Sequence, residues 1–272
     1  MRASGVRGVP VVANGTRRRR ARRRRVMWAG GEALVTVGAV LLLLVAHQLW
    51  WTNREARQGA ERKVAALERE WDADAPDAAP DGTGPADAGT VPAAPAPSAS
   101  PPGATARQRS YPAAGSSRPG RSRAYAVLTV PRLGLRVPVA EGVGKRDVLD
   151  KGYAGHYPGT QQPGRAGNFA LAGHRNTHGE PFRYLPRLRA GDTVRVETRT
   201  ATYTYAVDMI LPRTSARDSG VLRPVPRSAV RPSYGYKDPG YYLTLTTCTP
   251  EFTSRYRLVV WGKLLSMRPR SR

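Results

Sequence analysis

The segment YYLTLTTCTPEFTSRYRLVVWGKLL, residues 241–265, decides the fold. Its first part, YYLTLTTC at 241–248, alternates strongly between apolar and hydroxyl side chains. Its last part, YRLVVWGKLL at 256–265, is rich in aliphatic and aromatic residues. Both patterns are typical of β-strands. If the two strands form an antiparallel hairpin, position 257 lies beside position 248 in the register.

Other strand-like runs lie upstream of this hairpin, and helical periodicity is nearly absent from the same region. Only residues 147–157 and 180–188 are expected to supply single helical turns. Seven or so short strands within about 150 residues argue for a closed or nearly closed β-barrel. The upstream runs are residues 124–130, 135–140, 167–174, 192–199 and 201–211.

The N-terminal part has the pattern of a membrane anchor. Residues 17–25 read RRRRARRRR, and residues 26–51 contain one acid, Glu32, and an uninterrupted apolar stretch at 33–46, with tryptophans near both ends. This length suits a membrane span, and tryptophans favour the two interfaces. The arginines are expected to stay cytoplasmic, which places the rest of the chain outside. A cleaved signal peptide is the competing interpretation, but no good small-x-small cleavage site follows the apolar run.

The chain between the anchor and the strands changes composition twice. Residues 53–71 are charged and helix-prone, so they could extend the membrane helix briefly into solvent. From residue 72 to about residue 122, Ala, Pro, Asp, Gly and Ser dominate, and such sequence cannot bury a core. We therefore expect four parts. They are a basic cytoplasmic tail at 1–25, a transmembrane signal anchor at 26–51, a charged stalk and disordered linker at 52–122, and a folded domain at 123–272.

Composition excludes several classes of site and partner. A single cysteine in 272 residues rules out an internal disulfide framework and a cysteine-based zinc site. Four scattered histidines and few acids in the folded part predict no cofactor and no metal. A basic arm that binds nucleic acid would explain residues 17–25 but not the apolar run behind them, so no nucleic-acid partner is expected. The net charge of +15 on residues 123–272 (25 basic and 10 acidic residues) either attracts anionic wall polymers and lipid head groups or only solvates the surface.

Cys248 is the candidate nucleophile. Most free cysteines are small buried hydrophobic residues. An unpaired thiol outside the cytoplasm is, however, exposed to oxidation, and is likelier to persist where chemistry needs it. Cys248 also ends a strand, where a side chain can meet substrate. Its reactivity requires the thiolate form, which a nearby imidazolium or guanidinium stabilises.

His174 and Arg257 are the candidate partners of this thiol. His174 ends the apolar run GNFALAGH and can act as an acid toward a leaving group. His178, four residues later, and His156, in AGHYPGT, are the competing histidines. Arg257 lies beside the thiol in the predicted hairpin, where its guanidinium could hold a thiolate, a substrate carbonyl or an oxyanion. Arg255, one residue before the apparent strand start, is the competing arginine.

These residues together carry a family resemblance. LAGHRNTHGEPFRYLPRLRAGDTV, followed by YLTLTTCTPEFTSRYRLVVWGKL, resembles the sortases, membrane-anchored cysteine transpeptidases of Gram-positive bacteria. The TTCTPEF motif and the GHYPGT…GNFALAGHR stretch resemble class E, the actinobacterial type. The resemblance covers roughly residues 123–266. It implies a closed sortase-type barrel of about eight strands with a few short helical turns, and makes 123–272 the catalytic domain.

The resemblance also implies a role for each site residue. Cys248 would attack the Thr carbonyl of a C-terminal LAxTG- or LPxTG-like sorting signal on a secreted protein and form a thioester. His174 would protonate the leaving amine, and Arg257 would position the substrate and stabilise the oxyanion. An amine of the cell-wall precursor would then resolve the thioester. Tyr157, in GHYPGT, is the candidate substrate-binding residue. The implied partners are these secreted proteins, the peptidoglycan-precursor amine and the cytoplasmic membrane.

Three other classes fit the residues less well. An L,D-transpeptidase also uses Cys and His outside the membrane, but its serine/threonine-His-Gly-Cys run is absent, and THGE at 177–180 has Glu in the Cys position. A papain-like hydrolase has Cys before His, whereas here His174 precedes Cys248. A basic β-domain that binds wall polymers would leave the thiol without a purpose.

Overall fold

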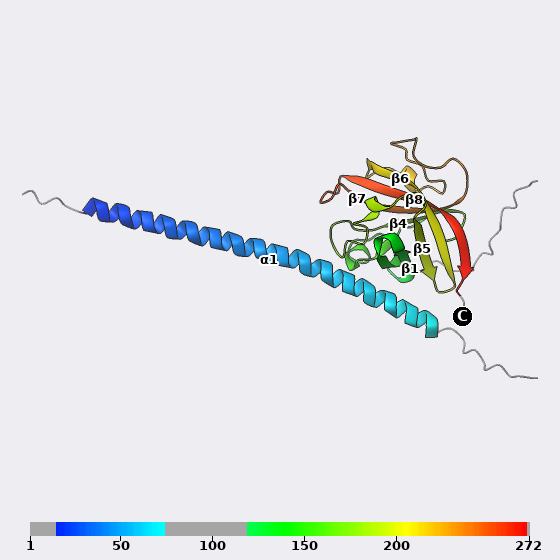
Figure 1. Ribbon diagram of the computed structural model, residues 1–272, viewed down its shortest axis with the longest axis horizontal. Helices are drawn as coiled ribbons and strands as arrows, with labels where there is room; N and C mark the ends of the chain where they lie inside the picture. The colour runs from blue at the N-terminus through cyan, green and yellow to red at the C-terminus, as the bar shows by residue number, and fades with distance from the viewer. Residues whose placement is uncertain (1–14, 74–118, 271–272) are drawn as a thin grey trace, which may run out of the picture. The chain divides into compact units, whose positions relative to one another are not determined.

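A computed structural model describes residues 15–73 and 119–270 of the chain. It consists of one long helix, eight strands and four short 3₁₀ turns (Figure 1). The expected disordered linker falls largely on residues 74–118, which lie outside the described residues, as do residues 1–14 of the expected tail.

The helix α1 (Gly15–Ala73) crosses the boundary between two compact units, Met1–Trp51 and Thr52–Arg272. In the first unit its apolar side chains, including Leu41 to Leu44, are exposed to solvent. A helix that is apolar all round without being covered by protein suits a lipid environment. Residues 26–51 extend about 39 Å as a helix, against about 30 Å for a bilayer core. Within the described residues, α1 is the one helix long and apolar enough to span a membrane.

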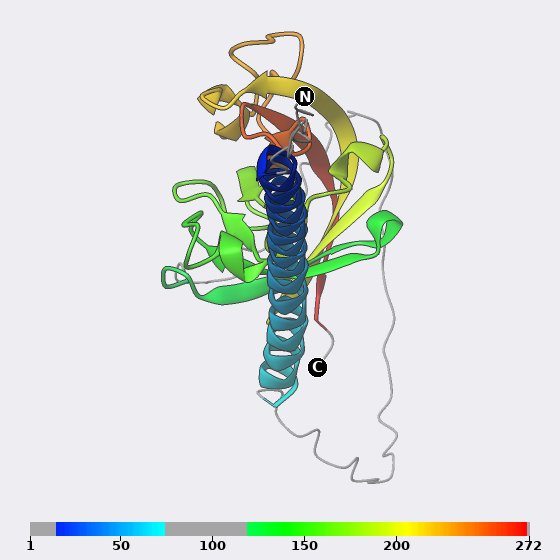
Figure 2. The ribbon, with the colours of Figure 1, turned by 90° about the vertical axis from the view of Figure 1, so that its left-hand side faces the viewer.

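The second unit is built on a closed eight-stranded barrel. Around the barrel the strands follow the order β1-β2-β3-β4-β7-β8-β6-β5. All neighbouring pairs are antiparallel except β2–β3 and β4–β7, which are parallel. Figures 1 and 2 show the strands curving around a common interior. The strands are β1 (Ala124–Val130), β2 (Leu135–Glu141), β3 (Ala154–His156), β4 (Gly167–Ala172), β5 (Thr193–Thr198), β6 (Ala201–Ser215), β7 (Tyr241–Thr249) and β8 (Tyr256–Pro269).

Alternating side chains fill the interior. In β5, for example, Val194 and Val196 are buried, while the residue between them is exposed. The interior cluster includes Phe169, Leu243 and Leu245. β7 does not alternate in burial, because its outward side is also covered: Tyr242 packs with Trp261 in a second cluster outside the barrel. A strand buried on both faces is held firmly, which suits a strand that carries a reactive residue.

The predicted mainly β closed barrel is therefore confirmed, and so are the long strands at its C-terminal end. The sequence missed β3, whose three residues lie within the 147–157 segment expected to form a helical turn. That segment forms both the turn η2 (Leu149–Lys151) and β3. Three residues are too few to show a strand periodicity, and only pairing with β2 and β4 defines them.

The charged segment 52–73 continues α1, as the sequence suggested, but it does not run free in solvent. One stripe of the helix is buried against the barrel unit: Val64, Leu67 and Trp71 pack with Val127 and Ala140 of β1 and β2. Salt bridges surround the stripe, from Glu68 to Arg136, Glu70 to Arg123 and Asp72 to Arg270. The apolar spacing of three and four residues was present in the sequence, but the many charges between hid it. The stripe is Ala56, Ala60, Val64, Leu67 and Trp71.

Candidate active site

Cys248 is the next-to-last residue of β7, where the strand leaves the barrel. Its thiol is free and half-buried. Side chains two residues apart on a strand share a face, so Cys248 and Thr246 point to the same side. The fold thus fixes the direction of the thiol by the pairing of β7 with both neighbouring strands.

The segment after β4 runs alongside Cys248. β4 and β7 are parallel and pair up to Ala172 and Thr246. Beyond that pair, the Thr247 hydroxyl donates to the Gly173 carbonyl at 2.9 Å. Arg175 then donates to the Cys248 carbonyl at 3.3 Å and to the Thr249 hydroxyl at 2.9 Å. His174 lies between these two contact points, beside Cys248.

Gly173 permits this arrangement. A Cβ atom at this position would lie 2.7 Å from the ring of Phe182, closer than real Cβ contacts. Phe182 is fully buried, and its backbone N–H donates to the His174 carbonyl at 3.0 Å. The apolar core therefore supports the backbone of His174 directly.

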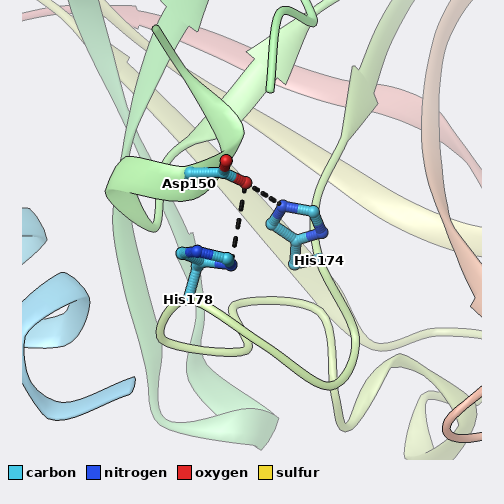
Figure 3. Close-up of side chains that lie close together, drawn as sticks. All are labelled: Asp150, His174 and His178. Atoms are coloured by element: carbon cyan, nitrogen blue, oxygen red, sulfur yellow. Dashed lines mark hydrogen bonds and ion pairs between the residues drawn. The ribbon is translucent and has the colours of Figure 1, made fainter. Parts of the chain in front are cut away.

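The His174 ring is oriented by Asp150, which lies in η2. Its Nε2 is 2.8 Å from Asp150 Oδ1, and because a carboxylate only accepts, Nε2 carries the proton (Figure 3). The second ring nitrogen, Nδ1, is then the one that can exchange a proton with a thiol or a leaving amine. In the part of the chain that the structure describes, the Cys248 thiol makes no hydrogen bond to this ring.

His178 faces the same oxygen of the Asp150 carboxylate (Figure 3). Its Nδ1 is 3.6 Å from Asp150 Oδ1, and its ring centroid is 5.3 Å from that of His174. The backbone of His178 has a positive φ of 51°. His178 is thus close to His174, but it lies four residues further along the loop that follows β4.

Arg257 of β8 lies directly opposite Cys248, as the hairpin spacing predicted. Its Nη1 donates to the carbonyls of Ser254 at 2.9 Å and Tyr256 at 3.0 Å. Arg255 is exposed, and its guanidinium lies 5.3 Å from the centroid of the Tyr256 ring; the Arg213 guanidinium lies 5.1 Å from the same ring. Of the two candidate arginines, Arg257 is therefore the one that lies opposite Cys248 in the β7–β8 register.

A cavity of about 180 Å³ opens beside this face of β7. Tyr157, Thr246 and Arg257 line one side, and residues of the β6–β7 connection line the other. The Tyr157 hydroxyl is 3.1 Å from the Thr246 hydroxyl. Thr246 and Cys248 share a face, so the cavity lies on the same face of β7 as the thiol, although Cys248 is not one of its lining residues. The remaining lining residues are Thr214, Ser215, Ala216, Arg217, Asp218, Ser219, Val221 and Leu222.

Asp218 holds the outer wall of this cavity. Its carboxylate accepts from the hydroxyls of Thr214 at 2.6 Å and Ser228 at 2.5 Å, and from the Ala229 N–H at 2.9 Å. Burial raises the pKa of Asp218, but the hydrogen bonds from Ser228, Thr214 and the backbone outweigh it, and the pKa lies below its usual value. The wall is therefore tied down by a charged group.

His156, the third candidate histidine, belongs to the core. Its side chain is fully buried, and its two ring nitrogens face Glu141 Oε2 at 2.7 Å and the Gln161 carbonyl at 3.0 Å. Its ring also packs edge-on against Phe169, at 4.9 Å between centroids. These contacts give His156 a structural place away from the thiol.

Sequence reasoning missed Asp150 and Arg175. Asp150 carries no local signal, because it contacts His174 only through the tertiary fold. Arg175 is adjacent to His174, but in an arginine-rich chain nothing marks it out. The arrangement as a whole offers a nucleophile, a proton carrier and a cation at adjacent strand ends, which is the requirement for acyl transfer through a thioester. Asp150, His174 and His178 are also a group whose ligand atoms could hold a metal ion.

This combination of barrel and site defines a class of protein, and comparison with known proteins agrees. The Sortase domain family matches residues 128–265, half of the chain. The chain belongs to the sortase family, so the resemblance seen in the motifs is confirmed.

Two curated relatives come from Streptomyces coelicolor. Sortase SrtE1 is 41% identical over 233 residues, covering 84% of this chain and 54% of the relative. Sortase SrtE2 is 31% identical over 232 residues, covering 81% of this chain and 75% of the relative. The chain thus spans about half the length of the first and three quarters of the second.

Solved structures show the same fold. The crystal structure of Sortase E1 from Streptomyces coelicolor, with a tripeptide in its active site, is 50% identical and has a TM-score of 0.51. The match between the two covers 54% of the present chain and 91% of the Sortase E1 chain. SrtF sortase from Corynebacterium diphtheriae is 28% identical, with a TM-score of 0.51. The match covers 58% of the present chain and 92% of the SrtF chain.

Proposed function

We propose that this chain is a membrane-anchored cysteine transpeptidase. It cleaves a C-terminal LAxTG- or LPxTG-like sorting signal of secreted proteins and transfers them to an amine of the cell-wall precursor. One observation carries the proposal: Cys248 lies between the His174 segment on one side and Arg257 on the other, at the ends of three paired strands. Membership of the sortase family supports the reaction class.

In the first half of the reaction, the Cys248 thiol gives its proton to Nδ1 of His174, and the resulting thiolate attacks the Thr carbonyl carbon of the signal. The carbonyl oxygen becomes an oxyanion, which Arg257 stabilises by its charge. As the C–N bond breaks, His174 donates a proton to the leaving amine from Nδ1. The products are a thioester on Cys248 and a free C-terminal peptide.

In the second half, the incoming amine gives its proton to His174 and attacks the thioester carbon. The C–S bond breaks, and the new amide joins the secreted protein to the wall precursor. Asp150 keeps the His174 ring in one orientation throughout, because Nε2 remains bonded to the carboxylate. Proton transfer therefore always uses the same nitrogen.

We assign substrate binding to the cavity beside the thiol, with Tyr157 in its wall. Tyr157 and Thr246 present hydroxyls to it, and Arg257 supplies the charge. A volume of about 180 Å³ suits a few small residues of an extended peptide. A signal with a small residue at its second position, as in LAxTG, fits this restricted space.

The proposed topology has one membrane span. Residues 1–25 are the cytoplasmic tail, residues 26–51 span the membrane, residues 52–122 form the stalk and linker, and residues 123–272 form the extracytoplasmic catalytic domain. The run of arginines before the span supports this orientation. The first 22 residues of the stalk are also helical and pack on the barrel unit, as described above.

The test is cleavage of labelled peptides by the full chain in detergent. LAxTG and LPxTG peptides should be cleaved in the presence of a small amine, a scrambled peptide should not, and mass spectrometry should find an acyl group on Cys248. The Cys248→Ala variant should lose both cleavage and the acyl adduct. Retained cleavage in this variant would disprove the thiol mechanism, and an inactive native chain would favour a wall-binding module.

A further inference from the structure

The group formed by Asp150, His174 and His178 has a feature that catalysis does not explain. Asp150 Oδ1 lies 2.8 Å from His174 Nε2 and 3.6 Å from His178 Nδ1, so one oxygen faces two imidazoles (Figure 3). The second distance is too long for a hydrogen bond. His178 Nδ1 is nevertheless buried and has no hydrogen-bond partner. A buried ring nitrogen that faces a carboxylate without bonding to it is open to a further ligand.

The spacing of these atoms suits a transition-metal ion. One ligand atom from each side chain lies within 4.8 Å of the other two. Zn²⁺ binds imidazole nitrogen and carboxylate oxygen at about 2.0–2.2 Å, which in a tetrahedral site separates neighbouring ligand atoms by about 3.3–3.5 Å. The observed 2.8 and 3.6 Å lie on either side of this value.

The ligand types also select the ion. Two imidazoles and one carboxylate are a common zinc set with one position left for water. Ca²⁺ requires six to eight oxygen ligands and Mg²⁺ is held by oxygen ligands in an octahedron, and this group offers one carboxylate. The three side chains are partly exposed, at 19% for His174, 29% for Asp150 and 31% for His178, so an ion can reach them.

The loop that carries His178 is held in place from α1. Arg57 donates to the Gly179 carbonyl at 3.0 Å and to Glu180 Oε2 at 2.9 Å. Asn53 bonds to Glu180 Oε1 at 3.0 Å and accepts from the Gly179 N–H at 3.2 Å. These bonds fix the backbone on the C-terminal side of His178, so its ring is kept near Asp150 before any ion arrives.

We propose that Asp150, His174 and His178 form a binding site for Zn²⁺ or a similar transition-metal ion, and that the bound ion switches the enzyme off. The inhibitory consequence rests on the proposed function, but the binding does not. The ion takes the place of the His174 Nε2 proton and breaks the bond to Asp150. It also withdraws electron density from the ring, so that Nδ1 is a poorer proton carrier. Turnover would then depend on the free metal concentration outside the cell.

Binding is measured by isothermal calorimetry on the full chain in detergent, in the Cys248→Ala background so that no thiol can ligate. Zn²⁺ is expected to bind at a single site and Ca²⁺ not at all. Adding Asp150→Asn or His178→Gln should weaken Zn²⁺ binding by at least about tenfold. Asp147→Asn, an exposed aspartate three residues from Asp150, is the matched control and should bind normally. Unchanged binding in both site variants, or no binding in the parent, overturns the proposal.

Inhibition is measured separately with the thiol intact. Zn²⁺ should inhibit peptide cleavage reversibly, with recovery on adding EDTA. His178→Gln should raise the inhibitory Zn²⁺ concentration by at least about tenfold. Equal inhibition of the native chain and His178→Gln would show that the ion acts through Cys248, which overturns the proposal. If the native chain cleaves no peptide, the proposed function fails while calorimetry still decides the metal site.

Discussion

At the level of single residues, the site depends on where three strand ends meet. Cys248, Arg257 and the segment containing His174 lie next to one another because β7 pairs with β8 on one side and with β4 on the other. None of these side chains needs to bond to another for this to hold. The candidate reactive groups are positioned by backbone pairing, and Asp150 orients the His174 ring, to which we assign proton transfer.

The two histidines near the thiol should differ sharply in importance. His174→Ala removes the group that moves the proton, so we expect kcat to fall at least about 100-fold. His178→Ala removes a ring further along the loop, so we expect kcat within about threefold of the native value when EDTA is present. Steady-state cleavage of the LAxTG peptide measures both. The reverse ranking would move the proton-transfer role to His178.

The two arginines of the β7–β8 hairpin provide a second matched pair. Arg257→Ala should lower kcat/KM by about 100-fold, because the oxyanion loses its stabilising charge. Arg255→Ala should change kcat/KM less than about threefold, because this side chain is exposed and lies over Tyr256. Similar losses in both variants would indicate a general effect of positive charge on substrate binding.

At the level of elements, the C-terminal part of α1 supports the catalytic loops. Its buried stripe packs on the outside of β1 and β2, and its polar residues bond to Gly179 and Glu180. Gly152, which ends the turn that carries Asp150, also lies against this helix: a Cβ there would be 3.0 Å from the Ala56 carbonyl. The helix thus contacts both segments that orient His174.

Breaking this contact should affect stability and activity together. Ala60→Asp places a charge on the buried stripe, where Ala60 is only 2% exposed. We expect the melting temperature to fall by about 5 °C or more, since an unpaired buried charge is costly. Ala65→Asp makes the same change on the exposed side of the helix and should leave melting unchanged.

Hydrogen exchange gives the second readout for this pair. Ala60→Asp should speed amide exchange in residues 174–180, because the loop loses its support from Asn53 and Arg57. Exchange in the β7–β8 hairpin should stay slow in both variants. If Ala60→Asp neither lowers melting nor changes exchange, the helix does not support the loop.

At the level of the whole molecule, one cysteine makes the proposed topology directly testable. Cys248 is the only thiol in the chain and is half-buried, so it can report on which side of the membrane the barrel lies. A membrane-impermeant methanethiosulfonate should label Cys248 in intact cells without lysis, because the arginine run keeps the other end inside. The Cys248→Ala strain is the control for background labelling. Labelling only after lysis would reverse the orientation.

The barrel and the order of its reactive residues followed from sequence because both depend on local patterns. The strand-like runs between residues 124 and 265 predicted a closed barrel. The spacing of the hairpin predicted that Arg257 lies opposite Cys248. The expectation that His174 acts with Cys248 required the family resemblance, because β4 and β7 are parallel and far apart in the chain.

Contacts between distant segments were decided only by the tertiary structure. Asp150 beside His174, the cavity next to Tyr157, and α1 against the barrel each join residues that no local pattern links. The sequence by itself determined the longer strands and the candidate nucleophile, since periodicity and the single cysteine are visible along the chain. What orients His174 and what supports its loop depend on closing the barrel and docking the helix, and these contacts exist only once the chain has folded.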